Sequence, residues 1–249
     1  MISLEQMYAC EIRFPWRFTE VAERDYGWLF HNADNPLSHD SNHAVILRLD
    51  GDLDAVLADI TAFYRRISVV PRVYPGFRPG EMDLLRPVLE RHGYRFDVYD
   101  DTYFVLGKSS SICPNPAVEV RRVRETDDAL ADLLRAAEGS DRTVRILRRH
   151  LEWDTFHCLA GYVDGHPVTL GSFDVGVACS RVDNVLTHPE CRGRGYCSAL
   201  MHAMVQQYPE VSQKPLYMWS AAPRAMKIYR RAGFVEFSAD RPGWGAWLE

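Results

Sequence analysis

The chain has 249 residues, of which 47% are hydrophobic and 25% charged, and a net charge of −5. This is the composition of an ordinary globular protein with room for one large or two small domains. Residues 1–117 hold 12 Lys/Arg and 17 Asp/Glu, so they carry the whole net charge. The sequence has no basic footprint for nucleic acid and no apolar run of about 20 residues for a membrane span.

Six cysteines are scattered along the chain without a Cys-x-x-Cys pair, and the histidines show no metal-ligand spacing. We therefore expect free thiols in a reducing compartment and no bound metal. The first residues are acidic where a signal peptide would be basic and then apolar. The prediction is a cytoplasmic protein, monomeric or homodimeric.

The first half of the chain alternates strand-like and helix-like patterns. Residues 44–49 and 71–74 read as strands, 52–66 and 82–91 as helices, and 94–106 as a pair of strands. Serine, proline and glycine then cluster at 107–116, as in a linker. We place a boundary near Cys113, which predicts domains at residues 1–112 and 113–249.

The second half continues the alternation. Strands are expected at residues 118–123, 156–163, 168–175, 181–187, 216–219, 234–237 and 244–248, and helices at 127–138, 143–153, 197–208 and 224–232. This order predicts an α/β (α+β) fold with a mixed central sheet flanked by helices.

Residues 187–200 read Thr-His-Pro-Glu-Cys-Arg-Gly-Arg-Gly-Tyr-Cys-Ser-Ala-Leu, a glycine-rich turn between a strand and a helix. Glycines let the backbone approach an anion, and a helix N-terminus attracts negative charge. Arg192 and Arg194 add positive charge. A P-loop is excluded because no lysine follows the glycines. A Rossmann turn is excluded because the sequence lacks the third glycine of that motif. The alternatives left open are a phosphate-binding turn and a turn without a ligand.

The spacing Arg192-x-x-Gly195-x-Cys197 resembles the acetyl-CoA motif of the GCN5-related N-acetyltransferase (GNAT) family. Cys197 departs from it, since the family has glycine or alanine there. The resemblance implies a GNAT fold and acetyl-CoA as acyl donor. It implies further that the backbone of Val185, Leu186 and Thr187 binds the pantetheine arm and the thioester. The amides of Arg192, Gly193, Arg194, Gly195, Tyr196 and Cys197 would hold the pyrophosphate.

A second run, Ala222-Pro-Arg-Ala225-Met-Lys-Ile-Tyr229-Arg-Arg-Ala-Gly233-Phe234, resembles the family's Asn-x-x-Ala-x-x-x-Tyr-x-x-x-Gly-Phe pattern, with Ala222 in place of the asparagine. The resemblance places Ala222 and Ala225 beside the cofactor and makes Tyr229 the acid that protonates the leaving thiolate. The alternative is that Tyr229 is a core aromatic.

An amine acceptor must lose a proton before it attacks, so a general base is needed. Asp183 on the strand 181–187 is the leading candidate, and a solvated carboxylate is the alternative. Strand alternation predicts Asp183, Val185 and Thr187 on one face.

The two halves also resemble each other. Residues 85–94 align with 225–234, which matches Gly93 to Gly233 and Leu89 to Tyr229. Only one glycine between two aspartates precedes the helix 52–66, a poor site for a pyrophosphate. We interpret the chain as a tandem GNAT fold whose first copy, 1–112, is degenerate. The alternative is a pattern shared by any two αβ units.

The expected function is transfer of an acetyl group from acetyl-CoA to an amine by direct attack in a ternary complex. The acidic first half favours a cationic amine. The alternative is a non-enzymatic CoA-binding regulatory or scaffold protein that retains the fold.

Overall fold

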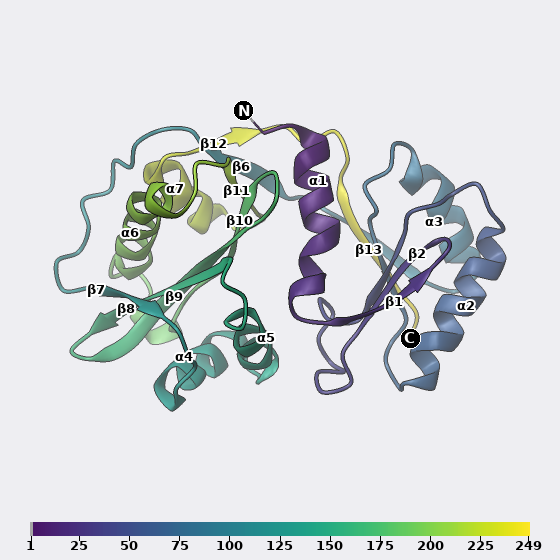
Figure 1. The fold of residues 1–249 in the computed structure, drawn as a ribbon, viewed down its shortest axis with the longest axis horizontal. Coiled ribbons are helices and arrows are strands. Elements are labelled where there is room, and N and C mark those ends of the chain that lie inside the picture. Colours follow the sequence, from purple (N-terminus) through teal and green to yellow (C-terminus); the bar gives the residue numbers. More distant parts are fainter. Residues whose placement is uncertain (1) are drawn as a thin grey trace. The chain divides into compact units, whose positions relative to one another are not determined.

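The computed structural model describes residues 2–249 (Figure 1). They form two compact units, each assembled from separate stretches of sequence. The C-terminal unit combines the residues up to Cys10 with Thr102–Ser238. The N-terminal unit combines Glu11–Asp101 with Ala239–Glu249. Helix α1 (Leu4–Arg13) spans the first division and leads into a short 3-10 helix, η1 (Phe14–Arg17).

A mixed sheet of seven strands forms the centre of the C-terminal unit. β10 and β11 are parallel, and the other neighbours are antiparallel. In spatial order the strands are β12 (Phe234–Phe237), β6 (Thr102–Leu106), β11 (Leu216–Ser220), β10 (Ser180–Thr187), β9 (His166–Val175), β8 (Phe156–Val163) and β7 (Glu119–Val123).

Two apolar clusters cover opposite faces of this sheet. One contains Leu170 and packs α4 (Asp128–Glu138) and α5 (Arg142–His150). The other contains Phe173 and packs α6 (Tyr196–Val211) and α7 (Pro223–Ala232). Leu170 and Phe173 are three positions apart on β9, so their side chains point to opposite faces.

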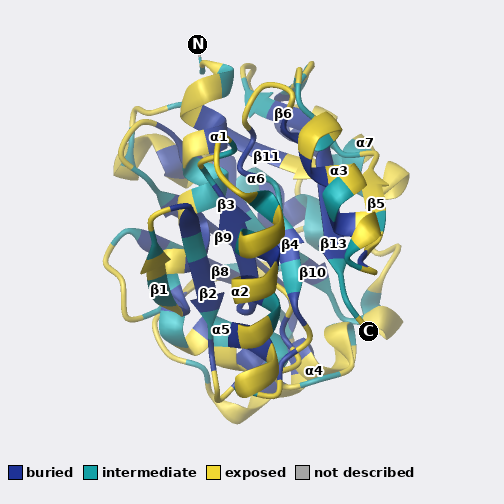
Figure 2. Cartoon of the chain, turned by 90° about the vertical axis from the view of Figure 1, so that its right-hand side faces the viewer, coloured by how far each residue is buried: buried dark blue, intermediate teal, exposed yellow. Residues whose placement is uncertain are grey.

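The N-terminal unit has a sheet of six strands and two helices, α2 (Leu53–Arg66) and α3 (Glu81–Arg91). Its core includes Leu57, Ile60, Leu85 and Trp244. Exposed and buried positions both occur along α2 (Figure 2), and its buried residues, which include Leu57 and Ile60, belong to this core. The strand order is β1 (Glu20–Arg24), β2 (Gly27–His31), β3 (His43–Ile46), β4 (Arg72–Tyr74), β13 (Gly243–Trp247) and β5 (Arg95–Tyr99).

Each sheet contains one strand from the end of the other half of the sequence. β6 lies between β11 and β12, and β13 lies between β4 and β5. The run β4, β13, β5 in one sheet therefore matches β11, β6, β12 in the other. Helices α2 and α3 hold the same places in chain order as α6 and α7. The two halves share one topology and have exchanged their final strands, so the predicted fold, twice in tandem, is confirmed.

The exchange differs from the expected organisation. Strands form within residues 94–106 and 244–248 as predicted, yet β5 and β6 belong to different sheets. Only Asp100 and Asp101 separate them, and the favoured two-residue hairpins need positive φ angles. Neither aspartate has one in the described chain. β5 and β6 therefore do not pair as a hairpin, and the compact units differ from the predicted domains 1–112 and 113–249.

The internal alignment has a structural counterpart at the ends of α3 and α7. Gly93 and Gly233 each follow the helix with positive φ, +81° and +106°. Leu89 and Tyr229 are both buried at matching positions of these helices. Gly233 is further constrained, because a Cβ on it would lie 2.1 Å from the carbonyl oxygen of Lys108.

We expect the fragment 102–249 to unfold cooperatively and the fragment 113–249 not to. The two differ by residues 102–112, which include all of β6. Without β6, the facing edges of β11 and β12 lose their backbone partners, and the fully buried ring of Phe104 leaves the core. Chemical denaturation followed by circular dichroism measures both. Equal cooperativity in the two fragments would show that β6 is dispensable.

Candidate active site

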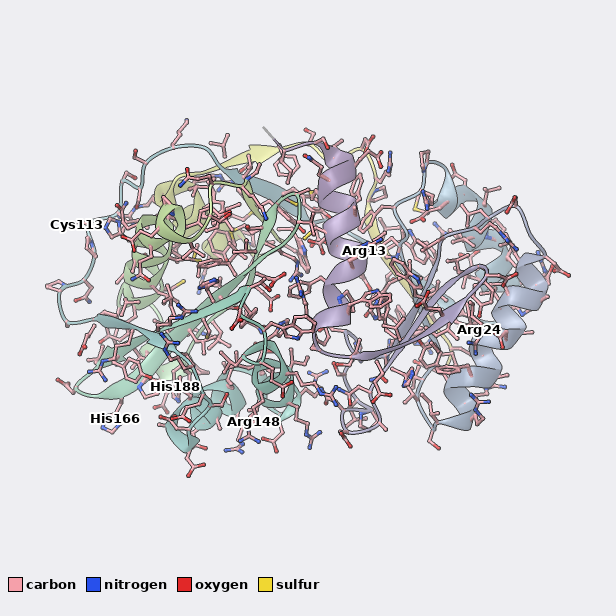
Figure 3. All side chains as sticks on the ribbon, viewed as in Figure 1. Arg13, Arg24, Cys113, Arg148, His166 and His188 are labelled. Atoms are coloured by element: carbon pink, nitrogen blue, oxygen red, sulfur yellow. The ribbon has the colours of Figure 1, made fainter. Side chains whose placement is uncertain are left out.

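The glycine-rich turn lies between the end of β10 and the start of α6. A short 3-10 helix, η2 (Pro189–Cys191), comes first, and Nδ1 of His188 accepts a hydrogen bond from the N–H of Glu190 at 3.3 Å (Figure 3). His188 thus has a local structural role. Gly193 and Gly195 follow, both with φ of +80°, a conformation that favours glycine. Gly195 is the residue from which α6 begins.

The backbone amides of this turn are available to a ligand. The N–H groups of residues 193–197 find no acceptor within the part of the chain that the structure describes. No side chain caps α6. A Cβ added to Gly193 or Gly195 would meet no atom within 4 Å, and Arg192 and Arg194 are exposed. Free amides, open space and a helix N-terminus together form a site suited to a phosphate group.

An open edge of β10 leads to this turn. β10 pairs with β11 only at Ser180 and Arg181, opposite Leu216 and Tyr217. Beyond that point β10 keeps β9 on one side, while β11 pairs with β6. Residues 182–187 of β10 therefore have no strand partner on their second side within the described chain. Such an edge can accept an extended ligand as an additional strand.

Hydrogen bonds near the end of β10 show which backbone groups face the open edge. The carbonyl of Leu186 accepts from the Thr169 hydroxyl at 2.7 Å, and the N–H of His188 donates to the Val168 carbonyl at 2.9 Å. Both groups are thus directed to β9. Because backbone direction alternates along a strand, the groups of Thr187 face the open edge.

A β-bulge changes the predicted faces of β10. Asp183 lies opposite Ser172 and Leu186 opposite Leu170, so three steps on β10 match two on β9. Asn184 has a φ of +47°, in the left-handed region that asparagine tolerates. Asp183 therefore shares a face with Leu186. The predicted common face of Asp183 and Thr187 is wrong, because strict alternation ignores the extra residue.

Tyr229 lies in α7 and is 5% exposed. Its ring centroid is 6.1 Å from that of Phe104 on β6. Burial raises the pKa of the Tyr229 hydroxyl well above its usual value, and nearby Cys197 raises it further. The phenol is therefore protonated at neutral pH. No residue among those described accepts a hydrogen bond from it, so its proton is available to a ligand.

Cys197 links the turn to Tyr229. Burial raises the pKa of its thiol to about 11, and a hydrogen bond with the Thr187 side chain offsets part of this effect. The thiol is neutral at pH 7, which argues against a nucleophilic role. Thr187, Cys197 and Tyr229 thus lie together where β10, α6 and α7 meet.

Asp183 is held by an arginine that the sequence analysis did not single out. Nη1 of Arg181 donates to Oδ1 of Asp183 at 2.7 Å, and the two side chains are 10% and 16% exposed. The sequence pattern could have predicted this ion pair, because opposite charges two positions apart on a strand share a face. Asp183 points to the face covered by α4 and α5, whereas Tyr229 lies on the other face. The open edge of β10 borders both.

Ala222 and Ala225 begin α7, directly after β11. Ala222 occupies the N-cap position without a side-chain cap, and its N–H donates to Oγ of Ser220 at 3.1 Å. The asparagine that the family motif has at this position is a preferred N-cap residue. Ala225 is partly buried against the cluster that contains Tyr229.

The corresponding turn of the first copy lacks these features. It follows β3 and leads into α2, where the carboxylate of Asp52 caps the helix by accepting from the N–H of Ala55 at 3.1 Å. Gly51 has no positive φ. An anion would meet the negative charge of Asp52 in place of free amides. Leu89, without a hydroxyl, occupies the position of Tyr229.

All six cysteines are free thiols, as predicted. Across residues 2–249, no cluster of three or more His, Cys, Asp or Glu side chains is arranged to hold a metal ion. Over the same residues, no helix combines the length and apolar character needed to cross a bilayer.

Residues 141–236 match the family model of an acetyltransferase (GNAT) domain. Among solved structures, a GCN5-related N-acetyltransferase from Kribbella flavida has a TM-score of 0.70 at 15% identity, covering 100% of this chain and 96% of its own. A functionally unknown conserved protein from Staphylococcus epidermidis has a TM-score of 0.62 at 15% identity, covering 97% and 98%.

A tandem GNAT protein from the clavulanic acid biosynthesis pathway also has this fold, with a TM-score of 0.54 at 15% identity, covering 82% of this chain and 74% of its own. No curated protein matches the sequence. Residues 141–236 are thus identified as an acetyltransferase (GNAT) domain, and the fold of the whole chain is similar to the folds of these GNAT proteins.

We expect Ala222→Asn to raise the free energy of unfolding of the C-terminal unit by about 0.5–2 kcal/mol, because the new side chain can cap α7. Ala221→Asn is the matched control, since Ala221 is also exposed but is not the N-cap residue. Urea denaturation compares the two. An equal change in both variants would rule out capping as the cause.

Proposed function

We propose that the protein transfers an acetyl group, or another short acyl group, from acetyl-CoA to an amine by direct attack in a ternary complex. The observation that carries this proposal is the set of free amides at residues 193–197, placed at the end of the unpaired edge of β10. The free amides suit a pyrophosphate, and the unpaired edge of β10 suits an extended arm that contains amide groups. CoA has a pyrophosphate joined to such an arm.

In this proposal the pantetheine arm lies along the open edge of β10. The backbone groups of Val185 and Thr187 pair with its amides, and the amides of residues 193–197 bind the pyrophosphate. The predicted amide of Arg192 is excluded, because its N–H donates to the carbonyl of Pro189 at 3.3 Å. An N–H at the same edge polarises the thioester carbonyl. Only the C-terminal copy binds the cofactor, because Asp52 occupies the corresponding helix N-terminus of the first copy.

Tyr229 protonates the leaving thiolate of CoA in this mechanism. The phenol is protonated at neutral pH, so its O–H can donate a hydrogen bond to the CoA sulfur as the C–S bond breaks and then pass its proton to that sulfur, and the phenolate regains a proton from solvent. Asp183 is the proposed base for the acceptor amine. The bond from Arg181 occupies one of its carboxylate oxygens and leaves the other to accept a proton directly or through water.

The acceptor class is a separate question. The acidic first half favours a cationic amine, but α5, which packs on the face to which Asp183 points, carries four arginines. Arg145 and Arg148 are exposed, and Figure 3 labels Arg148. An acceptor screen should therefore contain both polyamines and amines that carry an acidic group.

A non-enzymatic CoA-binding protein is the second candidate. It is favoured by the absence of a capping asparagine at Ala222 and by the ion pair that engages Asp183. This candidate predicts CoA binding without release of free CoA from acetyl-CoA on any acceptor, whereas the enzyme predicts turnover.

Gly195→Val should abolish measurable CoA binding, because its side chain would fill the space in which the backbone approaches the pyrophosphate. Isothermal titration calorimetry measures the affinity. Gly139→Val is the matched control. Gly139 also adopts the left-handed conformation, with φ of +71°, and an added Cβ would meet no atom within 4 Å, but this glycine is the C-cap of α4. Unchanged CoA affinity in folded Gly195→Val protein would refute binding at this turn.

Tyr229→Phe should lower turnover by roughly 10²–10⁴ with little change in CoA affinity, since it removes a proton donor and keeps the ring. Tyr208→Phe is the control. Tyr208 is buried in the same cluster, and its hydroxyl contacts Ser180 and Lys214. Steady-state release of free CoA measures both variants. Equal turnover in Tyr229→Phe and the parent protein would refute the role of Tyr229 as the acid and leave it only a packing role.

A further inference from the structure

The segment 107–116, which its composition marks as a linker, is bonded along the C-terminal unit. The N–H groups of Gly107 and Lys108 donate to the carbonyl of Gly233 at 3.1 and 3.0 Å, and that of Ser111 donates to the carbonyl of Arg231 at 2.8 Å. Oγ of Ser110 lies 3.1 Å from Nδ1 of His202 on α6. Ile112 is buried in the core cluster of α6 and α7. This part of the chain is therefore an ordered component of the unit.

The last side-chain contact of this segment, beyond the exposed Cys113 (Figure 3), reaches the glycine-rich turn. Nδ2 of Asn115 donates to the carbonyl oxygen of Arg194 at 3.0 Å. Oδ1 of Asn115 accepts from the N–H of Ala117 at 3.0 Å. The amide group of Asn115 is thus fixed at both ends, which defines the direction of the bond to Arg194.

The bonded carbonyl controls an amide of the proposed pyrophosphate site. The C=O of Arg194 and the N–H of Gly195 belong to one planar peptide group and point in opposite directions. A bond that fixes the carbonyl therefore fixes the direction of the N–H. Glycines with φ of +80° flank Arg194 on both sides, so the backbone itself does little to prevent rotation of this peptide.

We propose that Asn115 is a positioning residue for CoA: it holds the peptide between Arg194 and Gly195 so that the Gly195 N–H points at the pyrophosphate. The inference rests on the proposed function, in which this turn binds CoA. An amide fixed before binding spares the complex the conformational entropy of ordering it. Nothing in the family motif includes Asn115, which precedes Arg194 by 79 residues.

Asn115→Ala should weaken CoA binding about two- to twelvefold, the effect of losing one hydrogen bond of about 0.5–1.5 kcal/mol. Calorimetry with CoA on the full chain measures this loss. Ser110→Ala is the matched control, because it removes the contact of the same segment with His202 on α6 and leaves the bond from Asn115 to Arg194 in place. Asn115→Asp keeps the acceptor for Ala117, loses the donor to Arg194, and should also bind CoA more weakly.

A second measurement separates positioning from a general loss of stability. In ¹⁵N-labelled protein without ligand, the Gly195 amide resonance should broaden or split in Asn115→Ala, while that of Gly165, another positive-φ glycine, should not change. An unchanged CoA affinity, an equal loss in Ser110→Ala, or an unchanged Gly195 resonance would each overturn the role of Asn115. If the parent protein itself binds no CoA, the proposed function fails, and that result is read before any variant is compared.

Discussion

Backbone pairing of the exchanged strands is the constraint on which both sheets depend. β11 and β12 never contact each other as neighbours, because β6 supplies the hydrogen bonds between them. β4 and β5 depend on β13 in the same way. Each copy of the fold is therefore incomplete without a strand from the other half of the sequence. Neither residues 1–112 nor residues 113–249 therefore contain all the strands of one sheet.

This constraint extends to the proposed chemistry. Phe104 of β6 packs against Tyr229, so the environment that raises the pKa of the proposed acid includes a residue from the degenerate copy. Arg230, the next residue of α7, stacks over the same ring. The first copy has no glycine-rich turn and no tyrosine at the position of Leu89, yet its last strand completes the core beneath the site. Loss of a cofactor site therefore does not make that copy dispensable.

The sequence predicted the features that local chemistry determines. Glycines at 193, 195 and 233 adopt the left-handed conformations their positions suggested, and the order of strands and helices in the C-terminal half was largely correct. Three features were missed because they depend on distant partners or on an extra residue. Apolar alternation marks β6 as a strand without saying which sheet it joins. The bulge at Asn184 breaks the period that placed Asp183 and Thr187 on one face, and Asn115 lies in a segment whose composition suggested no contacts.

The helices α2 and α6 occupy equivalent places, but their first turns differ in one respect. α2 supplies its own cap through Asp52, while α6 leaves its N-terminal amides without an acceptor among the described residues. Exposed amides at a helix N-terminus are hydrated, and an anion that binds there in the folded state alone adds its binding free energy to the stability. The stability of the C-terminal unit should therefore rise with ligand concentration, by about 2.7 kcal/mol at one hundred times the dissociation constant. In the proposed complex, the ligand would supply to the first turn of α6 the negative charge that Asp52 supplies to the first turn of α2.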